Sequence, residues 1–385
     1  MKRYDLVIVG GSFAGLACAR TAALKGLKVA VLDSKPEAGA RVRTTGIVVK
    51  EASDDFDLPS HLMRKVRGAR LYAPSGRCVD LSAPGYFFQA TDTAGVLRWM
   101  AEEARRAGAE FFWGRKFESA VEHARGVALT GHDIHAGFLI GADGPRSRVA
   151  EVFGLSRNTR FLAGLEIECE PLADLDGRFL HCFADSRIAP GYIAWVVPGV
   201  GSTQIGVAAR RPHKPELGLL LRRLKDVCDV RAIKVRQRRS GLIPTGGTLR
   251  HLGTDRVMLV GDAAGMVSPA TGGGIHMALA FGRRAAQLVS DFLSDRGPHP
   301  VAQLAREAPR FRHQMLLRRL LDTVPPNLVI DTLLTTAPMR ALAQRVYFHS
   351  RSGANTSFDD WAEEFERGTL DTARPERNGP TLRLI

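Results

Sequence analysis

The segment "YDLVIVGGSFAGLACARTAALKGLKVAVLDSKP" (Tyr4–Pro36) decides the fold of the N-terminal part of the chain. Leu6–Val9 is a short apolar run typical of a buried strand, and Lys28–Leu32 is a second one. Between them, a glycine-rich turn precedes a predicted helix that ends at about Lys25. The order strand, helix, strand predicts a βαβ unit, so we expect the chain to begin with a Rossmann-type α/β domain.

The turn matches the dinucleotide-binding pattern G-x-G-x-x-G, with Gly10 first, Ser12 in place of the middle glycine and Gly15 last. The first glycine allows the tight turn, the middle position lets the backbone approach a diphosphate, and the last lets helix and strand pack closely. Unpaired N–H groups at the helix start attract the diphosphate. We therefore expect cofactor contacts from Gly10, Gly11, Ser12, Phe13, Ala14 and Gly15.

Asp33 follows the second predicted strand, where a carboxylate can accept the ribose hydroxyls of adenosine. An acid at this position favours an unphosphorylated ribose, and so FAD or NAD over NADP, without choosing between the first two. A plain structural loop is the alternative. The complete strand–helix–strand context with the acid in place argues against that alternative.

Two later segments favour a flavin. "HDIHAGFLIGADGPRSRVAEVFGL" (His132–Leu155) resembles the Asp-Gly segment of flavoprotein hydroxylases and their relatives. "RVMLVGDAAGMVSPATGGGIHMALAFGRRAAQLV" (Arg256–Val289) resembles the Gly-Asp segment of the same superfamily. There a predicted strand delivers Gly261 and Asp262, and a carboxylate so placed can accept ribityl hydroxyls. The glycines before the next helix, Gly272, Gly273 and Gly274, leave room and free N–H groups, although an Asp-capped turn alone would also explain the pattern.

The resemblance also implies roles for other polar residues. Asp143 stands where the superfamily has an acid that braces the dinucleotide region, with Arg146 and Arg148 beside it. Arg41 and Arg43 stand where an arginine often binds the FAD phosphates, and a guanidinium suits that contact. Before a later predicted helix the superfamily often has another arginine, where this chain has Thr93.

The stretch "GYIAWVVPGVGSTQIGVAA" (Gly191–Ala209) resembles a conserved segment of the geranylgeranyl reductase family, which hydrogenates isoprenoid double bonds with reduced FAD. The matching positions, which the resemblance makes candidate substrate-binding residues, are Tyr192, Trp195, Pro198 and Gly206. Halogenases and hydroxylases have a comparable segment, and ordinary core packing would also explain a Tyr and a Trp on one strand. The cysteine of archaeal members is replaced here by Thr44, Thr45 and Gly46, which leaves the proton donor unassigned.

These patterns predict a discontinuous domain organisation. The FAD-binding domain is expected at residues 1–55, 91–155 and 246–293, and a mostly antiparallel substrate domain at 56–90 and 156–245. Residues 294–385 are expected to form a helical C-terminal extension whose last residues, 372–385, are poorly ordered.

The charge and cysteine content limit the partners, the compartment and the metals that we expect for this protein. The net charge of +14 comes from arginines spread along the chain, so we expect no nucleic-acid partner; contact with an anionic membrane through the stretch 310–324 is the alternative to an ordinary amphipathic helix. Five cysteines without zinc-binding spacing predict a reducing, cytoplasmic environment and no metal. No apolar run reaches the roughly 18 residues of a spanning helix.

The favoured function is an FAD-dependent reductase of isoprenoid-type double bonds. A monooxygenase or halogenase acting through a flavin hydroperoxide, and a non-catalytic FAD-binding protein, are the alternatives. Because no second glycine turn of this kind is found, electrons would come from NAD(P)H bound transiently or from a protein donor. His181, His276 and Glu166 could act as acid or base, although each could equally be structural.

Overall fold

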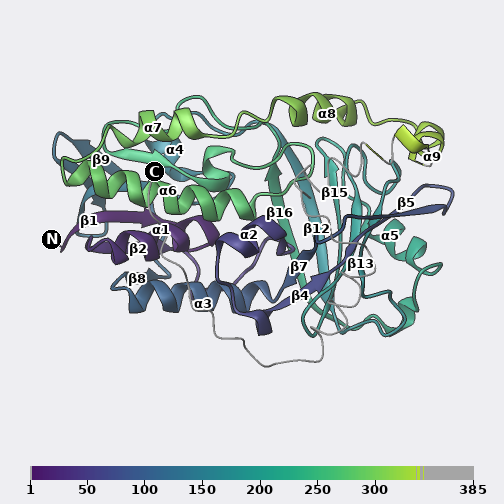
Figure 1. Cartoon of the computed structure of the whole chain (residues 1–385). Helices are drawn as coiled ribbons and strands as arrows, with labels where there is room; N and C mark the ends of the chain where they lie inside the picture. The colour runs from purple at the N-terminus through teal and green to yellow at the C-terminus, as the bar shows by residue number, and fades with distance from the viewer. Residues whose placement is uncertain (1, 335, 339–340, 342–385) are drawn as a thin grey trace.

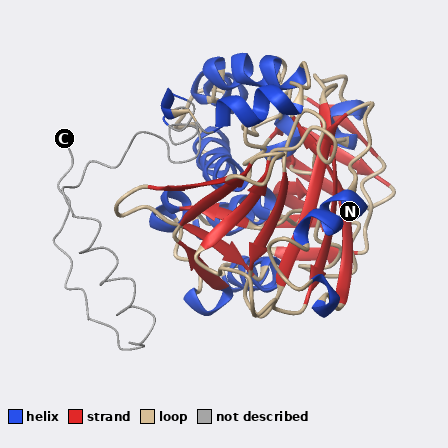
Figure 2. Ribbon diagram, turned by 90° about the vertical axis from the view of Figure 1, so that its right-hand side faces the viewer, coloured by secondary structure: helices blue, strands red, loops and turns tan. Residues whose placement is uncertain are grey.

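The computed structural model describes residues 2–334, 336–338 and 341 (Figure 1). The terminal segment 372–385, for which poor order is expected, lies outside the described residues. Two large sheets lie at opposite ends of the molecule, and Figure 2, turned by 90°, shows helices gathered along one edge of the strands.

The first sheet has the strand order β8 (Glu110–Trp113), β2 (Val29–Asp33), β1 (Lys2–Val9), β11 (Ile134–Gly141), β10 (Gly126–Thr130) and β9 (Ser119–His123), with β17 (Val257–Leu259) beside β11. The pairs β8–β2, β2–β1, β1–β11 and β11–β17 are parallel, and β9 and β10 are antiparallel. Strand β1 begins earlier than the apolar run predicts because Lys2 already pairs with Ile134. The predicted Rossmann-type domain is confirmed.

Helix α1 (Phe13–Leu24) packs between α3 (Thr93–Arg106) and α6 (Ile275–Leu293) beside this sheet. Small residues permit the α1–α6 contact: a methyl group added at Gly282 would lie 2.3 Å from the carbonyl oxygen of Ala14. This close approach brings the first glycine turn and the loop before α6 to the same end of the sheet.

The second sheet has the order β16 (Val235–Pro244), β12 (Phe161–Cys169), β15 (Thr203–Arg210), β14 (Ala194–Pro198), β13 (Phe179–Phe183), β5 (Gly68–Tyr72) and β6 (Cys78–Ser82). Every neighbouring pair is antiparallel except β13–β5, so the predicted, mostly antiparallel sheet is confirmed. Helix α5 (Leu217–Leu224) covers one face, where Leu220 and Leu224 share a core with Ile167. The other face is turned toward the first domain.

A third, three-stranded antiparallel sheet contains β3 (Ile47–Val49), β7 (Phe88–Thr91) and β4 (Met63–Val66). Of the strands expected for the substrate domain between residues 56 and 90, β5 and β6 join the large antiparallel sheet, whereas β4 and β7 pair with β3. The helix α2 (Lys50–Asp55) follows β3 directly.

The chain continues after α6 through α7 (Pro300–Glu307), α8 (Arg312–Asp322) and α9 (Asn327–Leu334), as the expected helical extension. In Figure 1 the segment that joins α7 to α8 passes along the top of the molecule from the first domain, and α8 lies above the strands of the second. Arg318 on α8 is buried and donates to the carbonyl of Gly191, and Asp322 pairs with Arg210 at 3.2 Å. Among the described residues, no helix has the length and apolar character required to cross a bilayer.

Candidate flavin and substrate site

The backbone of the first glycine turn lies so close to its neighbours that Gly10 and Gly15 have no room for a side chain. Gly10 has φ +110°, and a methyl group added there would lie 2.2 Å from the carbonyl oxygen of Ala142. One added at Gly15 would lie 1.8 Å from the carbonyl oxygen of Gly10. Ser12 is the N-cap of α1 and makes no side-chain capping bond, so the N–H groups of the first helical turn stay available for an anion.

Phe13 and Ala14 contribute packing and backbone at the start of α1, because both side chains are buried. Asp33, the last residue of β2, is held beside the turn: its carboxylate accepts from the backbone N–H of Gly11 at 2.7 Å and of Lys35 at 2.8 Å. A carboxylate has about four acceptor sites, so capacity for ribose hydroxyls remains. Asp33 therefore stays the predicted adenosine-binding acid.

The Gly261–Asp262 motif packs directly against the start of α1, next to the first glycine turn. A methyl group added at Gly261 would lie 2.9 Å from the Cβ of Ala14, and Gly261 has φ +60°. Asp262 follows, and no hydrogen bond to its carboxylate is formed within the described part of the chain, although its backbone carbonyl accepts from Asn158 Nδ2 at 2.9 Å. Burial raises the pKa of Asp262 to about 6.

The Asp262 side chain is only partly buried, so its carboxylate oxygens remain accessible to a ligand that can donate hydrogen bonds. Asp262 Oδ1 lies 3.4 Å from the position of a methyl group added at Gly274, the N-cap of α6. Gly273 is exposed and Gly272 has φ +66°, so this loop presents backbone rather than side chains. A group with hydroxyl donors, such as the ribityl chain of FAD, would satisfy this carboxylate.

Asp143, the next candidate cofactor residue, is held by hydrogen bonds within its own segment. Asp143 accepts from Ser147 Oγ at 2.6 Å and from the backbone N–H groups of Arg148 and Val149, so its carboxylate anchors the start of α4 (Arg148–Val152). Burial raises its pKa and these hydrogen bonds oppose the rise. Its backbone N lies 3.0 Å from the methyl position of Gly10, which places it beside the turn.

Arg41 and Arg43 are exposed, and neither guanidinium has a hydrogen-bond or ion-pair partner among the described residues. They are therefore available for a phosphate group. The backbone carbonyl of Arg43 lies 3.0 Å from the methyl position of Gly241 in β16, so this segment passes against the antiparallel sheet. Thr93, at the expected arginine position, is buried and lies 3.4 Å from the carbonyl of Thr45.

A row of side chains crosses the sheet face that is turned toward the flavin domain. In register, Arg239 lies opposite Glu166, Glu166 opposite Gly206, and Gly206 opposite Trp195. Two residues further along, and so on the same face, the strands carry the small residues Gly241, Gly164 and Ala208. A methyl group added at Gly164 would meet nothing closer than 3.8 Å.

Glu166 is the centre of this row. Its side chain is buried, and it accepts from Thr45 Oγ1 at 2.5 Å, Trp195 Nε1 at 3.0 Å and Arg239 Nη1 at 3.3 Å. Burial raises its pKa, whereas these donors lower it. Gly206 makes room for Trp195, since a methyl group there would lie 2.3 Å from the indole ring.

The other two residues of the Gly191–Ala209 pattern lie apart from Glu166. The Tyr192 hydroxyl donates to the carbonyl of Thr271 and lies 2.6 Å from the methyl position of Gly272, so this tyrosine joins the two domains at the glycine loop. Burial raises its pKa. Pro198 is buried at the end of β14, opposite Thr203.

His181 and His276, the two histidines considered as acid or base, both contact neighbouring protein groups. His181 is buried, with Nδ1 2.9 Å from the Tyr72 hydroxyl and Nε2 2.9 Å from the carbonyl of Asp176, and burial lowers its pKa. It lies on the α5 side of the sheet, because its neighbour Cys182 is the residue opposite Trp195. His276 lies in the first turn of α6, with Nε2 3.5 Å from Asp55.

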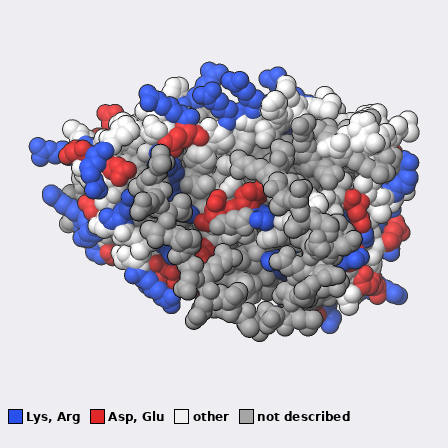
Figure 3. Space-filling view, viewed as in Figure 1, with Lys and Arg blue, Asp and Glu red and all other residues white. Residues whose placement is uncertain are grey.

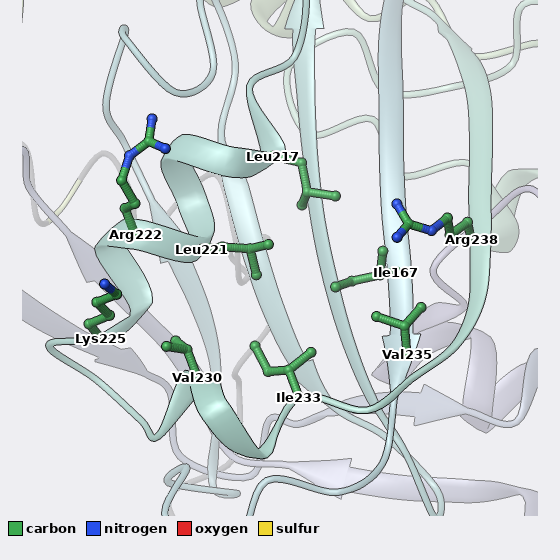
Figure 4. A pocket seen from close by; sticks show the side chains of 9 residues that line it. All are labelled: Ile167, Leu217, Leu221, Arg222, Lys225, Val230, Ile233, Val235 and Arg238. Atoms are coloured by element: carbon green, nitrogen blue, oxygen red, sulfur yellow. The ribbon is translucent and has the colours of Figure 1, made fainter.

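An apolar groove of about 360 Å³ lies on the α5 side of the same sheet (Figure 4). It is lined by Ile167, Leu217, Leu221, Arg222, Lys225, Val230, Ile233, Val235 and Arg238. Ile167 points into it, and adjacent residues of a strand point to opposite faces. Glu166 therefore faces away from the groove and toward the flavin domain.

The sequence reasoning missed the convergence of Thr45, Trp195 and Arg239 on Glu166. The signal was faint: Glu166 and Glu168 alternate with apolar residues on one strand, and Arg239 lies in another strand, but nothing in the sequence sets their register. It also missed Trp113, whose ring lies 2.7 Å from the methyl position of Gly11.

Comparisons with known proteins show the family. Residues 3–299 match the family described as FAD binding domain. Geranylgeranyl diphosphate reductase from Rhodobacter capsulatus is 32% identical over 316 residues, which cover 79% of each chain. The chain therefore belongs to the FAD binding domain family and is an FAD-dependent oxidoreductase. Within that class it is a homologue of the geranylgeranyl reductases.

Two solved structures share the fold. A geranylgeranyl bacteriochlorophyll reductase-like protein from Thermoplasma acidophilum aligns with a TM-score of 0.78 at 22% identity, covering 95% of this chain and 99% of that one. A probable FAD-dependent monooxygenase from Pseudomonas aeruginosa aligns with a TM-score of 0.67 at 18% identity, covering 87% of this chain and 100% of that one.

Proposed function

We propose that this oxidoreductase reduces carbon–carbon double bonds of an apolar, isoprenoid-type substrate. The 32% identity to a geranylgeranyl diphosphate reductase over most of both chains carries the proposal. When bound, reduced FAD supplies the hydride. The chain contributes Asp33, Asp262 and the glycine turns as a cradle for the cofactor.

The sheet face next to the glycine loop supports the same reading. Gly164, Ala208 and Gly241 present almost no side chain on this face, which suits a slender apolar chain. Ile243, two residues beyond Gly241, lies 3.4 Å from the methyl position of Gly272, so this row adjoins the loop that we assign to the flavin. An alkene held on this face would be shielded from water by the two domains.

The test is anaerobic. Protein loaded with FAD and reduced with dithionite is mixed with geranylgeranyl diphosphate, and the product is examined by mass spectrometry. We expect reoxidation of the flavin together with a gain of two hydrogens for each double bond reduced. Flavin that stays reduced, with an unchanged prenyl chain, contradicts the proposal.

A monooxygenase or halogenase is the second candidate, favoured by the fold shared with the Pseudomonas aeruginosa protein. It predicts that substrate accelerates oxygen consumption by the reduced protein, which an oxygen electrode measures. A non-catalytic FAD-binding protein predicts neither reaction.

We also propose NAD(P)H, bound only transiently, as the electron donor, with a protein donor as the alternative. To test this, the oxidised protein is mixed without oxygen with NADH or with NADPH. Reduction of the flavin is measured as the decrease in its visible absorbance. If neither nucleotide reduces the flavin, a protein donor replaces this proposal.

We further propose that α8 contacts an anionic lipid surface. Leu316 and Leu320, one helical turn apart, are 61% and 58% exposed, and Arg312 and Arg319 on the same helix are exposed. Figure 3 shows basic side chains gathered along the upper edge of the molecule, above α7 and the start of α8. Exposed apolar residues flanked by arginines suit an interfacial helix.

Flotation with vesicles of phosphatidylglycerol and of phosphatidylcholine tests this contact. We expect binding to the anionic vesicles, lost in Leu316→Asp and retained in the matched control Leu24→Asp, whose leucine is 66% exposed on α1. Equal behaviour of the two variants contradicts the assignment of α8.

A further inference from the structure

The Thr45 hydroxyl joins the segment that carries the candidate phosphate arginine to the sheet that faces the flavin domain. Thr45 follows Arg43, whose carbonyl contacts Gly241, and its own carbonyl lies 3.4 Å from Thr93 Oγ1. Its hydroxyl reaches Glu166 across 121 residues of sequence. Thr45 therefore lies beside the buried carboxyl group, at the sheet face that also carries the small residues.

The charges around Glu166 do not balance if every group is ionised. Arg239 is the basic residue that contacts Glu166, and the same guanidinium also forms an ion pair with Glu168. The side chains of Arg239 and Glu166 are 6% and 7% exposed, whereas that of Glu168 is 21% exposed. One buried guanidinium neutralises one carboxylate, and two carboxylates that share a site cannot both ionise easily.

If one of the two carboxyl groups keeps a proton, it is the more buried Glu166, and the better-solvated Glu168 carries the negative charge. The pKa of Glu166 is raised by its burial, in the same direction. Oε1 accepts from Arg239 and Oε2 accepts from Trp195, and the Thr45 hydroxyl donates to Oε2 whenever Glu166 is ionised. With a proton on Oε2, the same 2.5 Å contact lets Glu166 donate to Thr45 Oγ1. When Glu166 is the donor in this contact, the Thr45 hydroxyl hydrogen is free to point toward a substrate.

We propose that Thr45 is the proton donor to the substrate and that Glu166 is the positioning acid that resupplies it. This inference rests on the proposed alkene reduction. The alkene π bond breaks, one carbon receives the hydride, and the other receives the Thr45 hydroxyl proton. The Glu166 proton moves to the threonine oxygen in the same event, and solvent later reprotonates the carboxylate. Atoms and charge balance, because hydride and proton add up to two hydrogens on the substrate.

Three variants and one control test this relay. Thr45→Val removes the hydroxyl at nearly constant volume, Thr45→Ser restores it, and Glu166→Gln removes the acid. Thr44→Val is the matched control, since no contact joins Thr44 to Glu166 among the interactions of the described residues. Each protein is first checked for FAD content and for its unfolding temperature.

The first readout does not depend on activity. Infrared spectra of the oxidised protein, recorded as a function of pH, should contain the carbonyl stretch of a protonated carboxyl group at neutral pH. That band should be absent in Glu166→Gln and present in Thr44→Val. A wild-type spectrum identical to that of Glu166→Gln overturns the assignment of the proton.

The second readout separates the two half-reactions. Reduction of the flavin by dithionite should be the same in all variants. Reoxidation by the prenyl substrate without oxygen should slow about 100-fold in Thr45→Val and Glu166→Gln, in the range typical of a general acid. Thr45→Ser should recover most of the rate, and the pH dependence of the wild-type rate should be lost in Glu166→Gln.

The outcomes distinguish the two hypotheses. If wild-type protein reduces the alkene and Thr45→Val does so at the same rate, the relay is wrong and the proposed function stands. If wild-type protein does not reduce the alkene but the infrared band behaves as expected, the proposed function fails while the buried proton on Glu166 stands.

Discussion

Replacing Asp262 with asparagine should make the protein without FAD more stable and its binding of FAD weaker. The carboxylate of Asp262 has no hydrogen-bond donor among the described residues, and burial raises its pKa from 3.8 to about 6. A difference of that size corresponds to about 3 kcal/mol of unfavourable free energy for the ionised form. The side-chain amide of the introduced asparagine also lacks a partner, so it recovers only part of this free energy. We therefore expect Asp262→Asn to raise the free energy of unfolding by about 1–3 kcal/mol above pH 6.

The pH dependence follows from the same numbers. Between pH 3.8 and about 6 the native protein without FAD keeps a proton on Asp262 that the unfolded chain has released. The contribution of this group to the free energy of unfolding therefore falls as the pH rises through this window and is constant above it. Asp262→Asn should lack that fall, so the stability difference from wild type should be small at pH 4 and largest at pH 7–8.

FAD binding should change in the opposite direction. Hydroxyl donors stabilise the ionised carboxylate, so wild-type affinity should rise with pH through about 6. A hydrogen bond to a charged group contributes about 1.5–3 kcal/mol, so Asp262→Asn should raise the Kd for FAD by about 10-fold to 100-fold at pH 7.5.

Urea unfolding of the FAD-free protein between pH 4.5 and 8 measures the stability. Titration of FAD with the protein, followed by quenching of the flavin fluorescence, measures the Kd. Asp255→Asn, on an exposed residue just before β17, is the matched control and should change neither. A variant that is no more stable than wild type at pH 8 refutes the burial argument. One that is more stable but binds FAD with wild-type affinity refutes the assignment of Asp262 to the cofactor.

Three further substitutions test the packing around the site. Gly10→Ala should lower stability by about 1–3 kcal/mol and abolish FAD retention, because φ +110° is strained for alanine and its methyl group meets Ala142; flavin released by heating measures the retention. Gly282→Val should separate α1 from α6 and lower the unfolding temperature, a cost of about 1–3 kcal/mol or more in urea titrations. Arg318→Met should release α8 from Gly191 and speed limited proteolysis near residue 310, and unchanged proteolysis would show that this buried guanidinium does not hold the helix.

The amino-acid sequence by itself determined the flavin domain and indicated much of the candidate cofactor site. Gly10, Gly15, Asp33, Gly261 and Asp262 are recognisable because each requirement is local: a turn that only glycine fits, an acid at a strand end, and a helix that begins after both. Such local requirements can be recognised from the few residues that flank each position in the sequence. The mostly antiparallel character of the second sheet was likewise visible in its short alternating runs.

Only the tertiary structure decided which residues surround the proposed substrate face. Strand register places Glu166 opposite Gly206 and Arg239, and packing of the domains brings Thr45 onto the same carboxyl group. It also assigned Tyr192 to the contact between domains. A shift of one residue in the register would turn Glu166 to the α5 side of the sheet, and this register is set by contacts between distant segments, which no local pattern records.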